Sequence, residues 1–197
     1  MYTIPLLEDR QVVARPGDEG FTLIELLVVL LIIGVLLAIA IPTFLSTTGS
    51  ANNTSAQADL KTALTGADTY FMTAGSQSYA YLDSSAGGTS TITSVGTGLT
   101  YVSGSGAANS SSGPHVISVS VSNGGNTLVM TALAHGSLDC WGILDIKSTL
   151  TLSSALDHET AIGTYYFVVP GSSASACNAQ SASPSVGNIS STAFPHG

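Results

Sequence analysis

Charged side chains are scarce in this sequence, and basic ones are the scarcest. Only 8% of the 197 residues are charged, and 4 Lys and Arg against 12 Asp and Glu give a formal net charge of -8 at pH 7. Lys61 and Lys147 are the only lysines or arginines after Ser46. Two such cations are too few to neutralise a phosphate backbone. The composition therefore argues against nucleic acid as the main ligand.

Cysteine is nearly absent as well, with Cys140 and Cys177 as the only two. Both follow a long apolar segment of the kind that directs export, in a region rich in Ser, Thr and Gly. This context predicts one disulfide in an oxidising compartment, worth roughly 4 kcal/mol through the loop that it closes. The alternative is two separate buried thiols.

The sequence also lacks the usual signatures of catalysis. The four histidines have no recurring spacing, and the one dense polar triplet is Asp157-His158-Glu159 in a predicted loop. Three adjacent side chains cannot all face one ion, so we predict a solvated turn and no metal site. The glycines between Gly96 and Gly106 lack the following helix and lysine of a phosphate-binding loop. We therefore expect no metal, no cofactor and no enzymatic activity.

One long apolar segment, Phe21 to Leu45, dominates the first quarter of the chain. If it is helical it extends about 37 Å, enough to cross a hydrocarbon core of about 30 Å. Residues 1–20 contain proline, glycine and charged side chains without a sustained period, which predicts a flexible leader. The predicted organisation is thus a leader over 1–20, a transmembrane helix over 21–45 and a globular domain over 46–197.

A helical period continues beyond the apolar segment. Apolar residues recur at spacings of three and four, which predicts one buried face made of Leu60, Ala63, Leu64, Ala67, Tyr70 and Phe71. The residues between them should face water: Asp59, Lys61, Thr62, Thr65 and Asp68. The sequence therefore predicts one helix from near Phe21 to about Ala74, with a bend at Pro42.

Short alternating segments in the second half predict a sheet. Apolar residues alternate with serine up to Val121, the turn residues Asn123 to Asn126 follow, and Leu128 to Ala134 forms the second arm of a hairpin. Two further strands are predicted at Cys140 to Ser148 and Gly163 to Pro170, with a weaker candidate near Tyr101. The expected fold class is α+β, a long N-terminal helix on an antiparallel sheet of about four strands. The aromatic residues on these strands should serve packing: Trp141, Tyr165, Tyr166 and Phe167.

Glu25 lies inside the apolar segment, where an ionisable side chain costs at least a few kcal/mol and usually marks a partner or a function. A local explanation is a capping box, because Thr22-Leu23-Ile24-Glu25 has its spacing. A second interpretation treats the segment as a secretory signal peptide, since the small residues of Ala38-Ile39-Ala40 permit cleavage after Ala40 and release of a soluble binding domain. Against it, the apolar core is long and the charged region before it ends in Asp18-Glu19.

Residues Gly20-Phe21-Thr22-Leu23-Ile24-Glu25 closely resemble the processing site of type IV prepilins and pseudopilins. The resemblance implies that a membrane-embedded prepilin peptidase cuts between Gly20 and Phe21 and methylates the new N-terminus at Phe21. It extends to Pro42, where these proteins commonly have a helix-bending proline. It also implies that Glu25 pairs with the Phe21 amine of a neighbouring subunit and sets the axial position of each subunit during assembly.

The function implied by this resemblance is that of a structural subunit of a type IV pilus-like filament. Its partners would be copies of itself, the prepilin peptidase, an inner-membrane assembly platform and, before assembly, membrane lipid. It would lie in the cytoplasmic membrane first and in a cell-surface filament later. A pseudopilin of a type II secretion system is the alternative within the family. Such pseudopilins often carry an acidic calcium loop near the C-terminus, and Gly171 to Gly197 contains no acidic residue.

Overall fold

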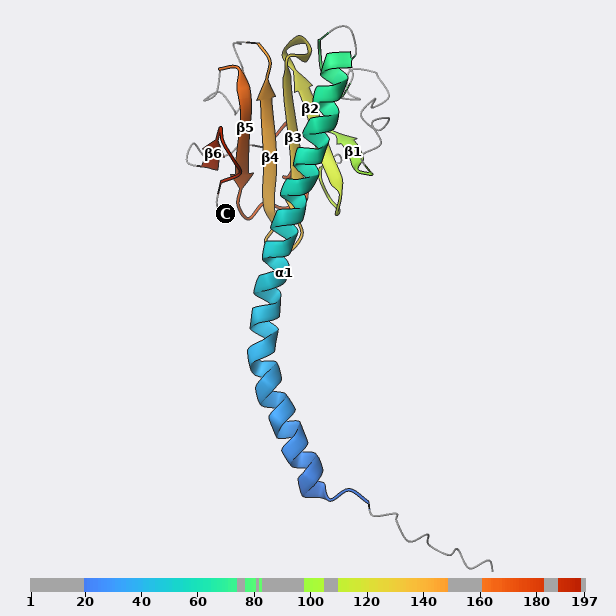
Figure 1. The fold of residues 1–197 in the computed structure, drawn as a ribbon, viewed down its shortest axis with the longest axis vertical. Coiled ribbons are helices and arrows are strands. Elements are labelled where there is room, and N and C mark those ends of the chain that lie inside the picture. Colours follow the sequence, from blue (N-terminus) through green and yellow to red (C-terminus); the bar gives the residue numbers. More distant parts are fainter. Residues whose placement is uncertain are drawn as a thin grey trace, which may run out of the picture. The chain divides into compact units, whose positions relative to one another are not determined.

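The structure, a computed structural model, describes residues 20–73, 77–80, 82, 98–104, 110–148, 161–182 and 188–195. Helix α1 (Leu23–Thr73) comes first and strands follow (Figure 1). The strands are β1 (Thr100–Ser103), β2 (Val116–Ser122), β3 (Thr127–Ala134), β4 (Asp139–Ile146), β5 (Gly163–Val169) and β6 (Ile189–Ser190), and the short helix η4 (Asn123–Gly125) joins β2 to β3. The predicted α+β class is confirmed. The chain divides into two compact units, Met1–Thr43 and Phe44–Gly197.

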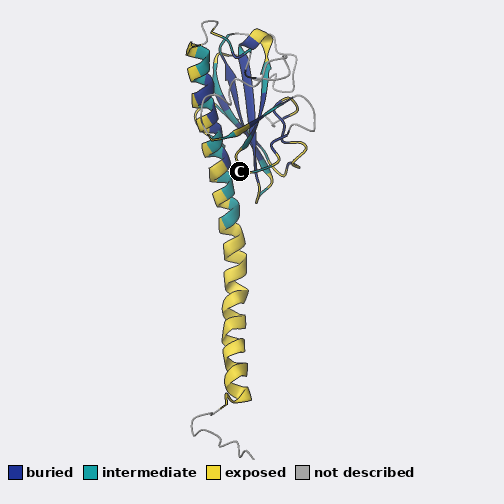
Figure 2. Ribbon diagram, turned by 90° about the vertical axis from the view of Figure 1, so that its right-hand side faces the viewer, coloured by how far each residue is buried: buried dark blue, intermediate teal, exposed yellow. Residues whose placement is uncertain are grey.

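In the first unit, the residues of α1 are apolar apart from Glu25 and Thr43, and all of them are exposed in the part of the chain that the structure describes (Figure 2). Its most apolar window has a mean hydropathy of 3.2, and none of that window is buried. By length and composition this is a helix that can cross a membrane. An α-helix satisfies its own backbone hydrogen bonds, which is the condition for a single segment to lie in lipid.

In the second unit, α1 buries one face, as the helical period predicts. Leu60, Ala63 and Ala67 are fully buried, while Leu64, Tyr70 and Phe71 are partly buried against the same core. The small residues Ala56 and Gly66 are buried as well, and side chains of this size let the helix approach the sheet closely. The core on this side is completed by Ile117, Val119, Leu128, Met130, Trp141 and Ile143 from the sheet.

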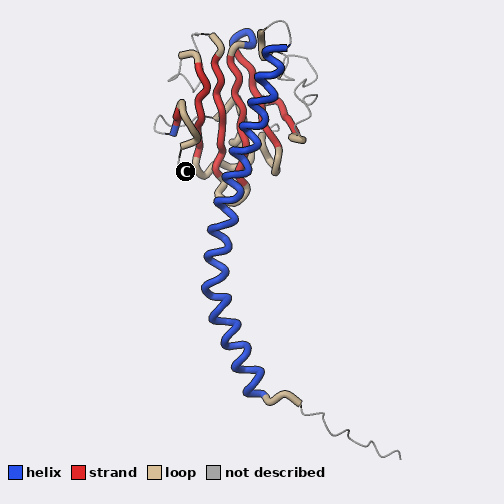
Figure 3. The backbone as a smooth tube through the Cα atoms, in the orientation of Figure 1, coloured by secondary structure: helices blue, strands red, loops and turns tan. Residues whose placement is uncertain are grey.

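The strands form one six-stranded sheet in the order β1-β2-β3-β4-β5-β6, as labelled in Figure 1, and Figure 3 shows the strands in red with α1 in blue. All neighbours are antiparallel except β1 and β2, which pair in parallel. The four predicted strands and the weaker candidate near Tyr101 are all present, but the prediction of about four antiparallel strands is too low, and the sheet is mixed. The missed strand β6 has only two residues, too few to show an alternating pattern, and no local signal tells that β1 pairs in parallel.

The other face of the sheet is covered by the segment after β5. Val129, Leu144 and Phe167 are buried there against Ala179 and Ala182. The predicted disulfide is present: Cys140 on β4 is bonded to Cys177, with a Cα to Cα distance of 5.3 Å, and both residues are fully buried. The Ala179 amide donates to Ser118 Oγ at 3.1 Å, which holds the same segment against β2.

The aromatic residues predicted to pack do so. Trp141 and Phe167 are buried, Tyr165 is 8% exposed, and Tyr166 packs partly buried against the core. The Trp141 indole N–H donates to Asn53 Oδ1 of α1 at 3.2 Å, so its polar atom is satisfied within the fold. These side chains therefore contribute to the core.

Two aspartates depart from the prediction that the polar side of α1 faces water. Lys61, Thr62 and Thr65 are exposed, but the side chains of Asp59 and Asp68 are only 16% and 34% exposed. Each meets a partner that is distant in the sequence. Because these partners, His115 just before β2 and Lys147 just after β4, lie far from α1 in the sequence, the helical period alone gives no sign of them.

The partners of Asp68 form a charge network between α1 and the sheet. Lys147 Nζ lies 2.9 Å from Asp68 Oδ1 and 3.0 Å from Asp145 Oδ2, and the Tyr79 hydroxyl donates to both carboxylates, at 2.9 and 2.6 Å. Thr164 Oγ1 adds a hydrogen bond to the buried Asp145 at 2.7 Å. Burial alone lowers the pKa of Lys147, but the hydrogen bonds to Asp68 and Asp145 outweigh it and raise that pKa above its usual value. Burial, and then the hydrogen bond to Asp145, raise the pKa of the Tyr79 hydroxyl far above its usual range.

Removing the cation should destabilise the fold. We expect Lys147→Gln to lower the free energy of unfolding by about 1–3 kcal/mol, because Asp145 stays buried with its charge uncompensated. Lys61→Gln is the matched control, since Lys61 is exposed and lies over the Phe194 ring at 5.7 Å. That control should cost at most about 0.5–1 kcal/mol. Thermal unfolding of the full chain in detergent measures both, and equal losses would contradict the structural role of the network.

Alkaline pH should weaken the same network. Tyr79 and Lys147 have a higher pKa in the folded chain than in the unfolded chain. The stability that they contribute is therefore fully present below about pH 10 and is lost as the pH rises toward their folded pKa values. We expect the melting temperature of the wild-type chain to fall more steeply between about pH 9 and 11 than that of Tyr79→Phe, which has no phenol to ionise. Parallel curves would show that the Tyr79 hydroxyl contributes nothing.

Candidate assembly site

The bond between Gly20 and Phe21 lies just before α1 and is open to solvent. Both residues are exposed, and Phe21 is 90% exposed. A Cβ placed on Gly20 would meet no heavy atom of the described chain within 4 Å. Packing within the described chain therefore gives no reason for a glycine here, whereas recognition by a processing enzyme would give one. Residues 1–19, with the rest of the predicted leader, lie outside the described residues.

Glu25 forms the predicted capping box at the start of α1. The Thr22 amide and hydroxyl both donate to Glu25 Oε2, at 2.9 and 2.7 Å, and the Glu25 amide donates to Thr22 Oγ1 at 3.3 Å. Two backbone N–H groups that the helix leaves without intrahelical partners are thereby satisfied. The second carboxylate oxygen, Oε1, takes part in none of these three bonds.

The side chains that follow Glu25 make a continuous apolar surface. From Leu26 to Ile41 every large apolar side chain is between 44% and 66% exposed. Soluble monomers rarely expose contiguous apolar surface of this extent, so this part of the helix needs lipid or protein around it. Glu25 is the only ionisable side chain between Phe21 and Thr43.

Pro42 lies inside α1 and changes its hydrogen bonding. A proline has no N–H, so the carbonyl of Ala38 lacks its usual partner four residues later. The hydroxyl of Thr43 donates to the neighbouring carbonyls of Ala40 and Ile39, at 2.9 and 3.3 Å. The helix therefore continues through the proline with one backbone bond fewer. The bend at Pro42 stays a prediction.

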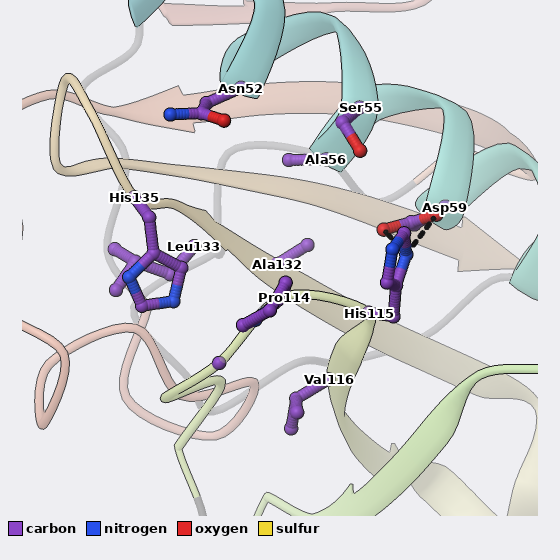
Figure 4. Close-up of a pocket in the computed structure, with 11 residues that line it drawn as sticks. Asn52, Ser55, Ala56, Asp59, Pro114, His115, Val116, Ala132, Leu133 and His135 are labelled. Carbon is purple, nitrogen blue, oxygen red and sulfur yellow. Dashed lines mark hydrogen bonds and ion pairs between the residues drawn. The ribbon is translucent and has the colours of Figure 1, made fainter. Parts of the chain in front are cut away.

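The second unit has a groove at one end that the sequence analysis did not predict. It has a volume of about 50 Å³ and is lined by α1, the turn before β2 and the end of β3 (Figure 4). At its rim, His115 Nδ1 lies 3.0 and 3.2 Å from the two carboxylate oxygens of Asp59. These residues are 56 positions apart, and neither belongs to a motif, so only the folded chain brings them together.

Among the described residues, no group of three or more His, Cys, Asp and Glu side chains is placed to hold a metal ion. The triplet Asp157-His158-Glu159 and His196 lie outside the described residues.

Comparison with known proteins identifies the N-terminal segment. Residues 15–41 match the family model of the prokaryotic N-terminal methylation motif. The chain is also similar to the type IV major pilin protein PilA of Myxococcus xanthus (strain DK1622), with 43% identity over 57 residues. The N-terminal segment is therefore similar to that of type IV pilins. This confirms the resemblance inferred from Gly20 to Glu25.

The pilin segment accounts for a limited part of the chain. The similarity to the Myxococcus pilin covers 29% of this chain and 26% of that protein. The matched motif contains Gly20, Phe21 and Glu25 and ends one residue before Pro42. No solved structure matches the chain. The comparisons therefore cover only a part of the chain. The six-stranded sheet and the disulfide of the second unit are described from this structure and from no relative.

Proposed function

We propose that this chain is a structural subunit of a type IV pilus-like filament and not an enzyme. The observation that supports it best is an exposed helical segment, apolar from Leu26 to Ile41, that begins with the Thr22 and Glu25 capping box directly after an accessible Gly20-Phe21 bond. In this proposal the prepilin peptidase removes residues 1–20 and methylates Phe21. Residues 21–45 then hold the subunit in the cytoplasmic membrane until an inner-membrane assembly platform adds it to a filament at the cell surface.

The physical reason for assembly lies in what can cover the helix. In the bilayer, lipid tails are as apolar as the leucine and isoleucine side chains, so the hydrophobic effect does not draw helices together there. Once the segment leaves the membrane, water is the alternative environment, and each large apolar side chain gains about 1.5–3 kcal/mol from full burial. In this proposal, the apolar side chains are then buried against the same segment of other subunits. Residues 46–197 then form the outer part of the filament.

Glu25 has a second role in this proposal. Cleavage creates a positively charged amine at Phe21, and Glu25 Oε1 is not engaged in the capping box. A carboxylate and an amine from neighbouring subunits that meet in an apolar bundle avoid the cost of leaving either charge unpaired. The pair can form at only one axial offset between two helices. Glu25 would therefore set where each subunit stops as it docks.

Two alternatives make different predictions. A pseudopilin of a type II secretion system would use the same N-terminal segment, and the absence of Asp and Glu from Gly171 to Gly197 favours the pilin. A secreted binding domain would require cleavage after Ala40. Ala38, Ile39 and Ala40 lie inside the continuous helix α1, and the Ala40 carbonyl accepts a hydrogen bond from Thr43, whereas Gly20 and Phe21 precede the helix. This difference in accessibility favours processing at Gly20.

The N-terminus of the protein recovered from its own cells tests the proposal. N-terminal sequencing together with the intact mass should find a chain that begins at Phe21 and carries one methyl group. A chain that begins at Ile41 would overturn the proposal and support the secreted binding domain. A chain that begins at Met1 would show that no processing occurs.

Glu25 variants separate the charge pair from the capping box. Glu25→Ala removes both, so cleavage should remain intact while the yield of filaments falls. Glu25→Gln is the informative control, because a glutamine at this position still completes a capping box but carries no charge. We expect Glu25→Gln to reduce filament yield as strongly as Glu25→Ala, as counted by electron microscopy of sheared filaments. Normal filaments from Glu25→Gln would assign the residue to capping alone.

A further inference from the structure

Exposed apolar side chains of the second unit gather at the end where α1 enters it. Among the described residues of this unit, the large apolar side chains that are at least half exposed are Phe44, Leu45, Met72, Leu138 and Ile162. Phe44 and Leu45 are the first two residues of the unit. Leu138 belongs to the turn between β3 and β4, which is distant in the sequence but lies at the same end.

The β3–β4 turn, His135–Leu138, lies directly on α1. A Cβ placed on Gly136 would be 3.0 Å from Gly49 Cα and 2.9 Å from Asn52 Nδ2, so the absence of a side chain permits this close approach. Asn52 and His135 also line the same groove (Figure 4). Gly49 follows Leu45 by four positions, which is about 6 Å along the helix. The turn is therefore held beside the part of α1 that has just left the apolar segment.

Leu138 is an unusual residue for its position in this turn. Its φ of +60° lies in the left-handed region, which costs free energy for most side chains and is adopted more readily by glycine or asparagine. Its amide donates to the Ala134 carbonyl at 3.0 Å, and the Ser137 hydroxyl donates to Asn53 Oδ1 at 2.6 Å, so the turn is fixed in this conformation. Backbone conformation and exposure thus both favour a polar residue. A leucine here is explained by a surface outside the unit that takes up an apolar side chain.

The length of the helix indicates which surface this is. Leu45 follows Glu25 by 20 positions, which is about 30 Å of helix and equals the thickness of a hydrocarbon core. When the ionisable Glu25 lies at one boundary of that core, Leu45 lies at the other. Gly49 is then about 6 Å further out, and the headgroup layer on each side is roughly 5–7 Å thick. The turn that contacts Gly49 is therefore at the depth of the lipid headgroups.

The charges at this end do not oppose contact with lipid. Of the four Asp side chains in the described part of the second unit, Asp59 and Asp139 are the two nearest this end. Asp139 accepts from Asn53 Nδ2 and from the Gly171 amide, each at 3.3 Å, and Asp59 pairs with His115. Residues 44–53 and 135–138 contain no Lys, Arg, Asp or Glu. Contact at this end is therefore apolar and should depend little on the charge of the lipid or on salt.

We propose that the β3–β4 turn lies on the membrane surface before assembly, with Leu138, Phe44 and Leu45 at the boundary between headgroups and acyl chains. The partner is a lipid surface, and the inference rests on the membrane stage of the filament function proposed above. Apolar side chains of peripheral segments are buried at this boundary in the same way. Contact through both the helix and the turn fixes how the second unit is rotated about α1 when the subunit is added to a filament.

Spin labels test the contact in the full chain reconstituted into phosphatidylcholine vesicles. A nitroxide at Leu138→Cys should collide often with dissolved oxygen, which concentrates among acyl chains, and several-fold less with a water-soluble nickel chelate than a nitroxide at Ile162→Cys. Ile162 is the matched control, because it is an exposed apolar residue directly before β5, at the opposite end of the sheet. The native Cys140–Cys177 disulfide is fully buried and should take up no label.

A second variant separates the leucine side chain from the label and from the fold. Leu138→Asn removes the apolar group and suits the left-handed conformation, so the melting temperature should stay equal or rise. With the nitroxide placed at His135→Cys in each case, Leu138→Asn should raise the collision rate with nickel several-fold, whereas Leu138→Met should leave it unchanged. The same rate in Leu138→Asn as in the wild-type turn would contradict the role of this side chain.

The outcomes separate this inference from the proposed function. A chain that stays on the vesicles during flotation, with equal nickel collision rates at positions 138 and 162, would overturn the contact and leave the filament function standing. A chain that does not stay on the vesicles would overturn the membrane stage of the proposed function, and this inference with it. Shielding of position 138 in filaments but not on vesicles would assign the turn to contact between subunits and would also overturn the proposal.

Discussion

The apolar surface of the segment from Phe21 to Leu45, which includes the first part of α1, is the constraint on which the rest of the protein depends. This segment buries nothing of its own, so water is an unfavourable environment for it, and it has to be covered by lipid or by other chains. Glu25 and Pro42 interrupt the apolar sequence without ending the helix, because Thr22 caps the helix with Glu25 and Thr43 donates to carbonyls next to the proline. By length and composition the segment can therefore cross a membrane, and in the proposed function it later packs against other subunits.

In the second unit, the continuation of the same helix packs against the sheet. There α1 is apolar on one face only, and small residues such as Ala63 and Ala67 bring that face close to the sheet. The network of Asp68, Lys147, Asp145 and Tyr79 adds polar contacts between distant parts of the chain. On the opposite face, the Cys140–Cys177 disulfide holds the covering segment in place.

The way in which this unit uses its few charges bears on assembly. A sequence with a net charge of -8 would be expected to repel its own copies. In the described part of the unit, however, each carboxylate is engaged with a histidine, a lysine, a tyrosine or an amide within the fold. These four carboxylates therefore serve contacts within the unit.

Local patterns were sufficient for much of this protein. The apolar segment, the helical period from Leu60 to Phe71, the hairpin between β2 and β3, and the motif from Gly20 to Glu25 are all readable from neighbouring residues, because each depends on spacing along the chain. Contacts between distant residues were not readable. The parallel pairing of β1, the burial of Asp68 by Lys147 and the approach of His115 to Asp59 join positions far apart in the sequence. Such contacts depend on which surfaces meet when the chain folds, and tertiary packing alone decides that.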